Sequence, residues 1–372
     1  MRTPSRDEKI HIATLNVRFD GHWGEPVPVP PEGHVPTHDL RRSTITSLLR
    51  TSDPYAEKPW SERRSRLVDA LLSTGPLDIV GFQEVLHGQL LDLVTLLGER
   101  YGYVGVGRDD GREVGEYSPI FWDQEHFKLV RWKTVWLSPT PDVPGSVGWD
   151  ASQTRIATLL TLSRVDGESP GQLVHVVNTH YDDAGLKARA ESSLIIREHT
   201  KRWVEQFEDP KDPARRPPAP VILLGDFNSP DDEEGYKNIT SFDPVPSGRP
   251  SFTFLDSFTH LQQRGRDDYS FHQLSVPRPK QTGVYGPLTT YTGFTGPGGI
   301  EKSRIDFIML AAEREPRKYT VGTAVDHGDR SRGGWAVLRY ACIDNWIEEG
   351  DVTGWQGRWS DHRAVRVTIQ RL

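Results

Sequence analysis

The sequence of 372 residues predicts an α/β fold, and three observations lead to this prediction. Runs rich in Val, Ile and Leu recur along the chain with the length of β-strands. Several of these runs are almost continuously apolar, as strands buried on both faces are. Stretches with apolar residues at helical spacing lie between them. We therefore expect helices that alternate with strands buried on both faces.

Seven segments are the clearest candidates for β-strands. Each is seven or eight residues long and carries several Val, Ile or Leu residues, a composition typical of buried strands. The predicted strands comprise residues 10–17, 78–85, 155–162, 173–180, 221–228, 304–310 and 362–369.

Three helices are predicted between these strands. Leu67 and Leu71 repeat at helical spacing, and Ser61 stands where an N-cap is expected. Residues 88–100 and 186–207 also carry apolar residues three and four positions apart. Each segment therefore has one apolar stripe that can pack on a sheet.

Long segments without either periodicity are predicted as loop insertions of one domain that spans residues 1–372. They cover residues 20–60, 228–290 and 326–359. Loops of this length are usually functional or disordered. Residues 208–220 contain five prolines, so we expect an extended surface loop there, inside the domain.

The last insertion contains four tryptophans: Trp335, Trp346, Trp355 and Trp359. These side chains can pin an irregular segment onto the body of the protein, or they can form a wall of a substrate cleft. We slightly prefer the first interpretation.

The charge balance argues against a broad nucleic-acid-coating surface. Lys and Arg total 45 and Asp and Glu total 52, which gives a formal net charge of −7. Proteins that coat nucleic acid present a basic face instead. A local basic groove is still compatible with this composition.

Cys342 is the only cysteine, so no intramolecular disulfide can form, and this favours a reducing compartment. Residues 1–10 lack the apolar region of a signal peptide. No segment approaches the roughly 18–20 apolar residues that span a bilayer. We predict a cytoplasmic protein with no membrane span and no obligate protein partner. A secreted protein whose signal peptide has been removed would look the same.

Polar residues stand at the ends of most predicted strands. A charged or imidazole side chain at a buried strand end is costly without partners, so we expect these residues to share one site at the sheet edge. The residues are Asn16, Glu84, His180, Asp226, Asn228, Asp306, Asp361 and His362.

This set of side chains predicts a particular chemistry. Carboxylate and amide oxygens are hard ligands that select Mg²⁺, Mn²⁺ or Ca²⁺ over Zn²⁺. Neutral Asn and cationic His can bind phosphoryl oxygens without competing for the metal. Each residue alone has an ordinary explanation, such as a turn former in Gly-Asp-Phe-Asn. The combination favours phosphoester chemistry.

Six motifs resemble the endonuclease/exonuclease/phosphatase superfamily, whose best-known member is deoxyribonuclease I. The resemblance extends from residue 10 to 370 and implies a single-domain, four-layer α/β/β/α sandwich with the site at one end. Residues 115–123 and 134–160 resemble a bacterial and fungal branch related to the deadenylase/nocturnin group. The six motifs are TLNVRFD (14–20), GFQEV (81–85), NTHYDDAG (178–185), GDFNSPDDEEGY (225–236), RIDFIML (304–310) and SDHRAV (360–365).

The resemblance implies a role for each candidate site residue in the first four motifs. Glu84 resembles the main Mg²⁺ ligand, with Asn16 beside it, and Mn²⁺ is expected to substitute for Mg²⁺. Asp226 matches the residue that orients or deprotonates the attacking water. His180 and Asn228 match groups that hold the scissile phosphate.

The remaining roles follow in the same way. His362, steered by Asp361, resembles the histidine that contacts a non-bridging oxygen in the transition state. Asp306 matches a second acidic residue that either binds metal or supports a catalytic side chain. Glu116 and Arg155 lie in the branch motifs and are implied to bind substrate.

Two positions depart from the family pattern. Many nucleases of the family have Asp two residues after the position of Asn16, whereas this chain has Arg18, which weakens a second metal subsite there. Asp183 stands where the branch usually has a second histidine, which adds negative charge near the cleft.

We expect a Mg²⁺-dependent phosphoester hydrolase that acts on nucleic-acid ends or nucleotides. The substrate would then be single-stranded nucleic acid or a phosphorylated small molecule. The alternative is a phosphomonoesterase or phosphodiesterase acting on a sugar, inositol or lipid head-group phosphate. A non-catalytic binding module on the same fold is a third and weaker alternative.

Overall fold

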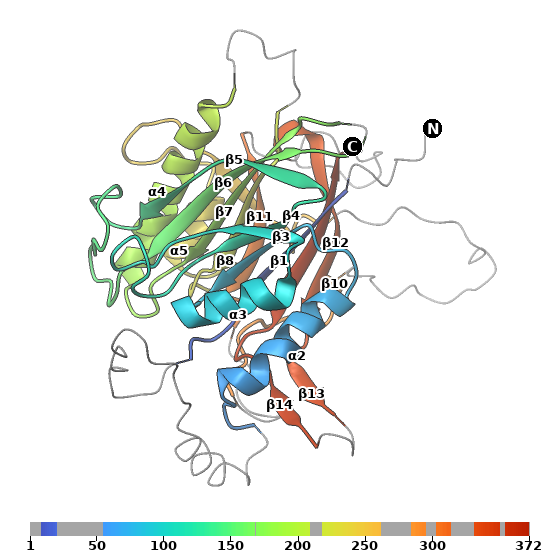
Figure 1. The fold of residues 1–372 in the computed structure, drawn as a ribbon. Coiled ribbons are helices and arrows are strands. Elements are labelled where there is room, and N and C mark those ends of the chain that lie inside the picture. The colour runs from blue at the N-terminus through green and yellow to red at the C-terminus, as the bar shows by residue number, and fades with distance from the viewer. Residues whose placement is uncertain are drawn as a thin grey trace, which may run out of the picture.

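The computed structural model describes most of the chain and carries two large β-sheets (Figure 1). No described helix is long and apolar enough to cross a membrane. The described residues are 9–20, 55–167, 169–208, 218–261, 284–294, 303–313, 331–349 and 354–371.

The first sheet has seven strands and contains both ends of the described chain. β1 pairs with β15 antiparallel and with β2 parallel. The strands follow one another in the order β10 (Val284–Tyr285), β12 (Trp335–Ile343), β15 (Ala364–Arg371), β1 (Lys9–Asn16), β2 (Ile79–Gln83), β4 (Ile120–Asp123) and β3 (Tyr101–Val104).

The second sheet has six strands. β7 and β8 pair parallel at its centre, and β11 pairs antiparallel with β8. The strand order is β5 (Phe127–Trp136), β6 (Ile156–Arg164), β7 (Leu173–His180), β8 (Val221–Asp226), β11 (Asp306–Ala312) and β9 (Thr253–Asp256).

The two sheets pack face to face, because alternate residues of each strand point to opposite sides. In β1, Ile12 points into the cluster between the sheets, whereas Leu15 points outward. In β8, Ile222 and Leu224 point inward, whereas Leu223 points outward. Both faces of these strands are therefore buried, as their continuous apolarity predicts.

Helices cover the two outer faces and complete four layers (Figure 1). α2 (Trp60–Ser73) and α3 (His87–Leu97) pack on the first sheet through leucines such as Leu67 and Leu93. α4 (Leu186–Glu205) and α5 (Glu234–Thr240) pack on the second sheet. The α/β/β/α sandwich expected from the resemblance is confirmed.

All seven predicted strands and all three predicted helices are present, with shifted ends. α2 begins at Trp60 with Pro59 at its N-cap, so the prediction that Ser61 caps this helix is wrong. Proline favours this start because its fixed φ angle suits the beginning of a helix.

Two of the predicted loop insertions contain regular structure, so the prediction that they are irregular is wrong for these parts. Residues 228–290 include α5, β9 and β10, and residues 326–359 include β12, β13 (Trp346–Glu348) and β14 (Gln356–Arg358). These strands are short or only half buried, so they lack a continuous apolar run. Residues 21–54 of the first insertion and 209–217 of the proline-rich segment lie outside the described residues.

The four tryptophans attach their segment to the body of the protein. Trp335 and Trp359 are 2% and 0% exposed and belong to the apolar cores. Trp346 stacks on Tyr55 with ring centroids 4.5 Å apart. The Arg66 guanidinium lies 4.3 Å from the Trp355 ring centroid on the outside of α2. The preferred interpretation of a pinned segment agrees with these contacts.

Candidate active site

The sheet topology brings the predicted site residues to one end of the sandwich. β1 and β2 run parallel, and Asn16, the last residue of β1, pairs with Gln83, which precedes Glu84. β7 and β8 also run parallel, and their last residues, His180 and Asp226, are paired. Side chains at the carboxyl ends of these four strands meet, because Asn16 of one sheet contacts Asp226 of the other.

The Asn16 amide joins two carboxylates across the interface between the sheets. Its Nδ2 donates to Glu84 Oε1 at 2.8 Å and to Asp226 Oδ2 at 2.9 Å. Asn16 and Asp226 are 0% and 1% exposed. One amide group with two hydrogens thus holds both carboxylates in place.

His180 and Asn228 continue the group on the side of the second sheet. Asn228 Nδ2 lies 3.1 Å from His180 Nε2 and donates to the Tyr181 carbonyl oxygen at 3.0 Å. The Asn228 backbone N–H donates to Asp226 Oδ1 at 2.9 Å. His180 Nε2 lies 3.6 Å from Asp226 Oδ2. The Gly-Asp-Phe-Asn turn therefore aims both polar side chains at one histidine.

Asp306 holds His362 against this group. Asp306 opens β11 directly opposite Asp226 in the sheet. Its Oδ2 lies 2.9 Å from His362 Nδ1, while His362 Nε2 lies 3.7 Å from Asp226 Oδ2. The ring of Tyr291 lies 5.0 Å from the His362 ring. The imidazole therefore bridges two buried carboxylates.

The hydrogen bond that orients His362 is made with Asp306 and not, as was expected, with Asp361. Asp361 acts on the imidazole through its nearby negative charge. The Asp361 carboxylate accepts from Ser360 Oγ at 3.4 Å and is close enough to Glu84 for their charges to interact. Asp361 therefore belongs to the Glu84 side of the site.

Arg155 and Glu116 both border His180. Arg155 NH1 lies 3.1 Å from His180 Nδ1, and its NH2 donates to Asp183 Oδ1 at 2.8 Å. Glu116 Oε2 lies 3.6 Å from His180 Nδ1 and accepts from Arg108 NH1 at 2.7 Å. Arg155 is 4% exposed, so it is a buried residue of the site and not a strand-surface arginine.

Backbone strain concentrates at this end of the molecule. Arg18, Glu84 and Asn228 have φ angles of 61°, 58° and 46°, in the left-handed region that L-residues seldom adopt. Among the described non-glycine residues, Trp149 is the fourth with such an angle. Strained conformations persist where surrounding contacts over-determine them, and this is common at functional sites.

The two histidines have opposite protonation tendencies. Burial, with help from the Arg155 charge, lowers the pKa of His180 to about 4. Burial alone would also lower the pKa of His362, but the carboxylates of Asp306 and Asp226 outweigh it and raise that pKa well above its ordinary value. At neutral pH we therefore expect a neutral His180 and a cationic His362.

The carboxylates are crowded and buried. Burial and the nearby Asp306 charge raise the pKa of Asp226. Burial raises the pKa of Asp361 to about 6; His362 opposes this effect and Glu84 adds to it. A cation placed among these carboxylates would relieve their mutual repulsion.

The donor set fits a hard divalent cation. Glu84, His180 and Asp226 offer ligand atoms within 4.8 Å of one another, and Asp226, Asp306 and His362 form a second such group. Asp226 belongs to both groups and most donors are oxygen atoms, which suits Mg²⁺ or Mn²⁺. Asp306 Oδ1 is buried without a hydrogen-bond partner among the described residues.

Two positioning residues escaped the sequence analysis. Asp182 is 1% exposed, accepts from the Gly185 backbone at 2.7 Å and lies 3.4 Å from Arg155 Nε. Burial opposes ionisation of Asp182, but the hydrogen bonds from Gly185 and Ser152 lower its pKa to about 2. Arg108 holds Glu116. Asp182 stands two residues after His180 in the motif at 178–185, so its position could have indicated a role at the site. Arg108 lies in none of the six motifs, so no sequence pattern indicated its role.

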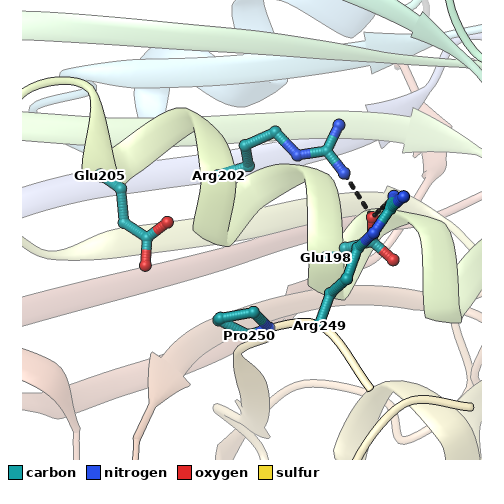
Figure 2. A pocket seen from close by; sticks show the side chains of 5 residues that line it. All are labelled: Glu198, Arg202, Glu205, Arg249 and Pro250. Carbon is teal, nitrogen blue, oxygen red and sulfur yellow. Dashed lines mark hydrogen bonds and ion pairs between the residues drawn. The ribbon is translucent and has the colours of Figure 1, made fainter. Parts of the chain in front are cut away.

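A separate surface hollow lies away from the site residues described above. Glu198 pairs with both Arg202 and Arg249 there, so the hollow's charges are mutually neutralised. α4 begins beside the site, and the twelve helical steps from Leu186 to Glu198 span about 18 Å at about 1.5 Å each. Figure 2 shows this hollow of about 280 Å³, lined by Glu198, Arg202, Glu205, Arg249 and Pro250.

A two-sheet sandwich with carboxylates, amides and imidazoles at its strand ends defines a deoxyribonuclease I-like protein. The sequence model of the Endonuclease/Exonuclease/phosphatase family matches residues 13–362. The chain therefore belongs to this family, whose members are generally phosphatases and nucleases.

Solved structures agree with this fold. An endonuclease/exonuclease/phosphatase from Bacteroides vulgatus has a TM-score of 0.63 at 24% identity, over 98% of this chain and 99% of that one. The mannosyl-6-phosphatase Bt3783 of Bacteroides thetaiotaomicron has a TM-score of 0.63 at 23% identity, over 97% and 99%. The human nocturnin catalytic domain has a TM-score of 0.54 at 16% identity, over 99% and 95%. No curated protein matches the sequence.

Proposed function

We propose that this protein is a Mg²⁺-dependent hydrolase of phosphoesters, with Mn²⁺ able to replace Mg²⁺. The observation that carries the proposal is the continuous group from Glu84 through Asn16 and Asp226 to His362 and Asp306, buried at one sandwich end. Such a group can neutralise a phosphoryl charge and position water at the same place. A non-catalytic role would leave this costly arrangement without a purpose.

Asp226 is the residue that orients the attacking water and takes its proton. Its Oδ2 lies between the Asn16 amide, His180 Nε2 and His362 Nε2, at 2.9, 3.6 and 3.7 Å. A buried carboxylate with a raised pKa is a better base than an exposed one. A water bound to this carboxylate would lose its proton to Asp226 as it attacks a phosphorus atom held by the neighbouring side chains.

His362 and Asn228 hold the phosphoryl oxygens. The cationic His362 donates from Nε2 to a non-bridging oxygen, while Asp306 fixes the ring through Nδ1. Asn228 Nδ2 donates in the same region, and the neutral His180 keeps Asn228 in place. These donors gain strength as negative charge develops in the transition state.

Glu84 and Asn16 are the residues that would hold the metal, with Asp361 nearby. A bound Mg²⁺ supplies positive charge to the phosphoryl group and helps stabilise the leaving oxygen. Glu84→Gln should lower kcat by at least about 100-fold, and EDTA should abolish turnover of the wild type. Glu99→Gln, at an exposed position, is the matched control.

Nucleotides or nucleic-acid ends are the first candidate substrates, and one observation favours a second candidate. Arg155 is paired with Asp182 and Asp183, and Arg108 with Glu116, so these two described arginines offer little free positive charge to further phosphates. A single phosphate on a neutral polar group, such as a sugar phosphate, suits this balance.

The test is a panel of phosphate compounds with Mg²⁺, with Mn²⁺ and with EDTA. It should include mononucleotides, short oligoribonucleotides, sugar and inositol phosphates, and lipid head-group phosphodiesters. Metal-dependent release from at least one class supports the proposal. Binding without turnover of any compound would favour a non-catalytic module, and turnover by Glu84→Gln in EDTA would contradict the metal mechanism.

A further inference from the structure

Arg18 is a strained residue beside Asn16 and Glu84 of the proposed catalytic group. Hydrogen bonds hold both its N–H and its carbonyl oxygen. Its φ angle is 61°. Its N–H donates to Asn16 Oδ1 at 2.9 Å, and its carbonyl oxygen accepts from Gln89 Nε2 and Arg63 NH2, each at 3.1 Å. The neighbouring Phe19 N–H donates to Glu84 Oε2 at 3.1 Å. This backbone therefore positions both Asn16 and Glu84.

The Arg18 guanidinium stands next to the carboxylate that would bind metal. Its NH1 lies 3.9 Å from Glu84 Oε2, and its Nε donates to Glu57 Oε1 at 3.3 Å. The guanidinium carbon lies 4.4 Å from the Phe19 ring centroid. The side chain is 21% exposed, so several contacts hold its charge close to Glu84.

The Arg18 charge makes the electrostatic environment different on the two sides of the Glu84 carboxylate. On one side, His180 and Asp226 offer further ligand atoms within 4.8 Å of a Glu84 oxygen. On the other side lies the positive charge of Arg18. Like charges a few ångströms apart repel strongly where water is partly excluded. A divalent cation is therefore admitted on the Asp226 side and repelled on the Arg18 side.

We propose that Arg18 takes the place of a second metal ion beside Glu84 and restricts the Glu84 carboxylate to one divalent cation. The guanidinium supplies a permanent positive charge that Glu84 would otherwise share with a second cation. The inference rests on the proposed function, because it takes Glu84 to be the metal ligand.

The experiment measures Mn²⁺ binding to the metal-free full-length chain by electron paramagnetic resonance and calorimetry. The variants are Arg18→Asn and Arg18→Asp, because Asn and Asp tolerate positive φ better than most residues. The ions at Glu84 are counted as those that the added change Glu84→Gln removes. We expect one such Mn²⁺ in the wild type, one with roughly tenfold lower Kd in Arg18→Asn, and two in Arg18→Asp. Arg64→Gln on α2, which breaks an ion pair with Asp92 on α3, should bind like the wild type.

The outcomes separate this inference from the proposed function. Two Mn²⁺ ions at Glu84 in the wild type, or an unchanged Kd in Arg18→Asn, would overturn the role of Arg18 even if hydrolysis depends on metal. Equal Mn²⁺ binding by the wild type and Glu84→Gln would contradict Glu84 as the ligand and with it the proposed function. Thermal melting checks that each variant is folded, and Arg18→Asn decides the matter if Arg18→Asp does not fold.

Discussion

The side chains around His362 determine the orientation and the charge of its imidazole ring. Asp306 Oδ2 lies 2.9 Å from its Nδ1, and Asp226 Oδ2 lies 3.7 Å from its Nε2. These carboxylates outweigh the effect of burial and keep the ring protonated. A charged imidazole at this place can act on the negative charge that forms in the transition state.

We therefore predict that His362→Ala lowers kcat by about 10²–10⁴-fold with a much smaller change in KM. Asp306→Asn should lower kcat less, because the ring stays present but loses its charged partner. Steady-state kinetics on the best phosphate substrate measures both. A change in KM alone would mean that His362 only helps to dock the substrate.

His126, which is hydrogen-bonded to Asp78 just before β2, leads to a prediction of how the stability of the protein depends on pH. Its hydrogen bond to Asp78 Oδ1 at 2.7 Å raises its pKa, against the effect of burial and with help from Asp123. A raised pKa in the folded state gives stability that is fully present below the unfolded value near 6.5 and is lost as pH rises through the folded value. We expect His126→Gln to be less stable than the wild type at pH 5–6.

The measurement is the free energy of unfolding by urea for both proteins between pH 5 and 9. The difference between them should shrink steadily as the pH rises. A difference that is constant with pH would show that the histidine contributes packing or hydrogen bonding but no charge.

The sequence predicted which residues meet at the site but not how they pair. Asn16, His180 and Asp226 stood at the ends of apolar strands, and this pattern indicated a shared location. The pairing of His362 with Asp306 depends on how the two sheets pack, because Asp306 opens β11 of one sheet and His362 precedes β15 of the other, and the sequence does not state this packing. Arg108 contacts Glu116 because the loop between them folds back, and no sequence motif predicts this contact.

At the scale of elements, β2 and β7 approach each other very closely inside the sandwich. Asn178 on β7 donates from Nδ2 to the carbonyl oxygens of Phe82 and Pro119, each at 2.8 Å. Gln83 Nε2 donates to Asn178 Oδ1 at 2.7 Å. These buried hydrogen bonds connect the two sheets next to Glu84, while Gln83 Oε1 has no hydrogen-bond partner among the described residues.

Gly81 permits this approach, because a Cβ atom there would lie 2.8 Å from Asn178 Cγ and would also clash with Leu224. We predict that Gly81→Ala destabilises the protein by about 1–3 kcal/mol, the usual cost of overpacking a core. Urea unfolding gives this value. The control is Gly88→Ala in α3, where a Cβ meets nothing within 4 Å and a neutral or slightly stabilising effect is expected.

The elements differ in how well the sequence predicted them. β6, β8 and β11 are buried along their whole length, and their largely apolar sequences predicted each of them. β12 alternates between buried and partly exposed residues and includes Arg339, so it resembled an irregular segment. β13 and β14 have three residues each and depend on pairing with one another, which no local pattern records.

At the scale of the whole molecule, charge and the site's surroundings bear on substrate size. The net charge of −7 gives a long polyanion no general attraction. The buried Arg155 and Arg108 at the site are paired with carboxylates. Trp335 and Trp359 are buried, so they offer no stacking surface to a base, contrary to one interpretation of the tryptophan-rich segment.

We therefore predict that small phosphate compounds or single-stranded ends are better substrates than internal sites of a DNA duplex. Duplex binding depends on many simultaneous phosphate contacts by unpaired Lys or Arg, and those contacts release counterions. A single terminal phosphate needs only the catalytic group and one metal ion. The ratio of kcat/KM values should therefore favour the small substrates at physiological salt.

The test is a competition assay at fixed Mg²⁺ and salt, with supercoiled plasmid, short oligoribonucleotides, mononucleotides and sugar or inositol phosphates. Asp183→Asn provides a sharper comparison, because it removes the carboxylate that pairs with Arg155 NH2 at 2.8 Å. The Arg155 guanidinium then keeps Asp182 as its acidic partner but is less neutralised. This change should improve kcat/KM for oligonucleotides more than for sugar phosphates, since only the former carry several charges. Rapid nicking of plasmid by the wild type, without hydrolysis of any small compound, would contradict the prediction, because it would require cationic contacts to a duplex backbone.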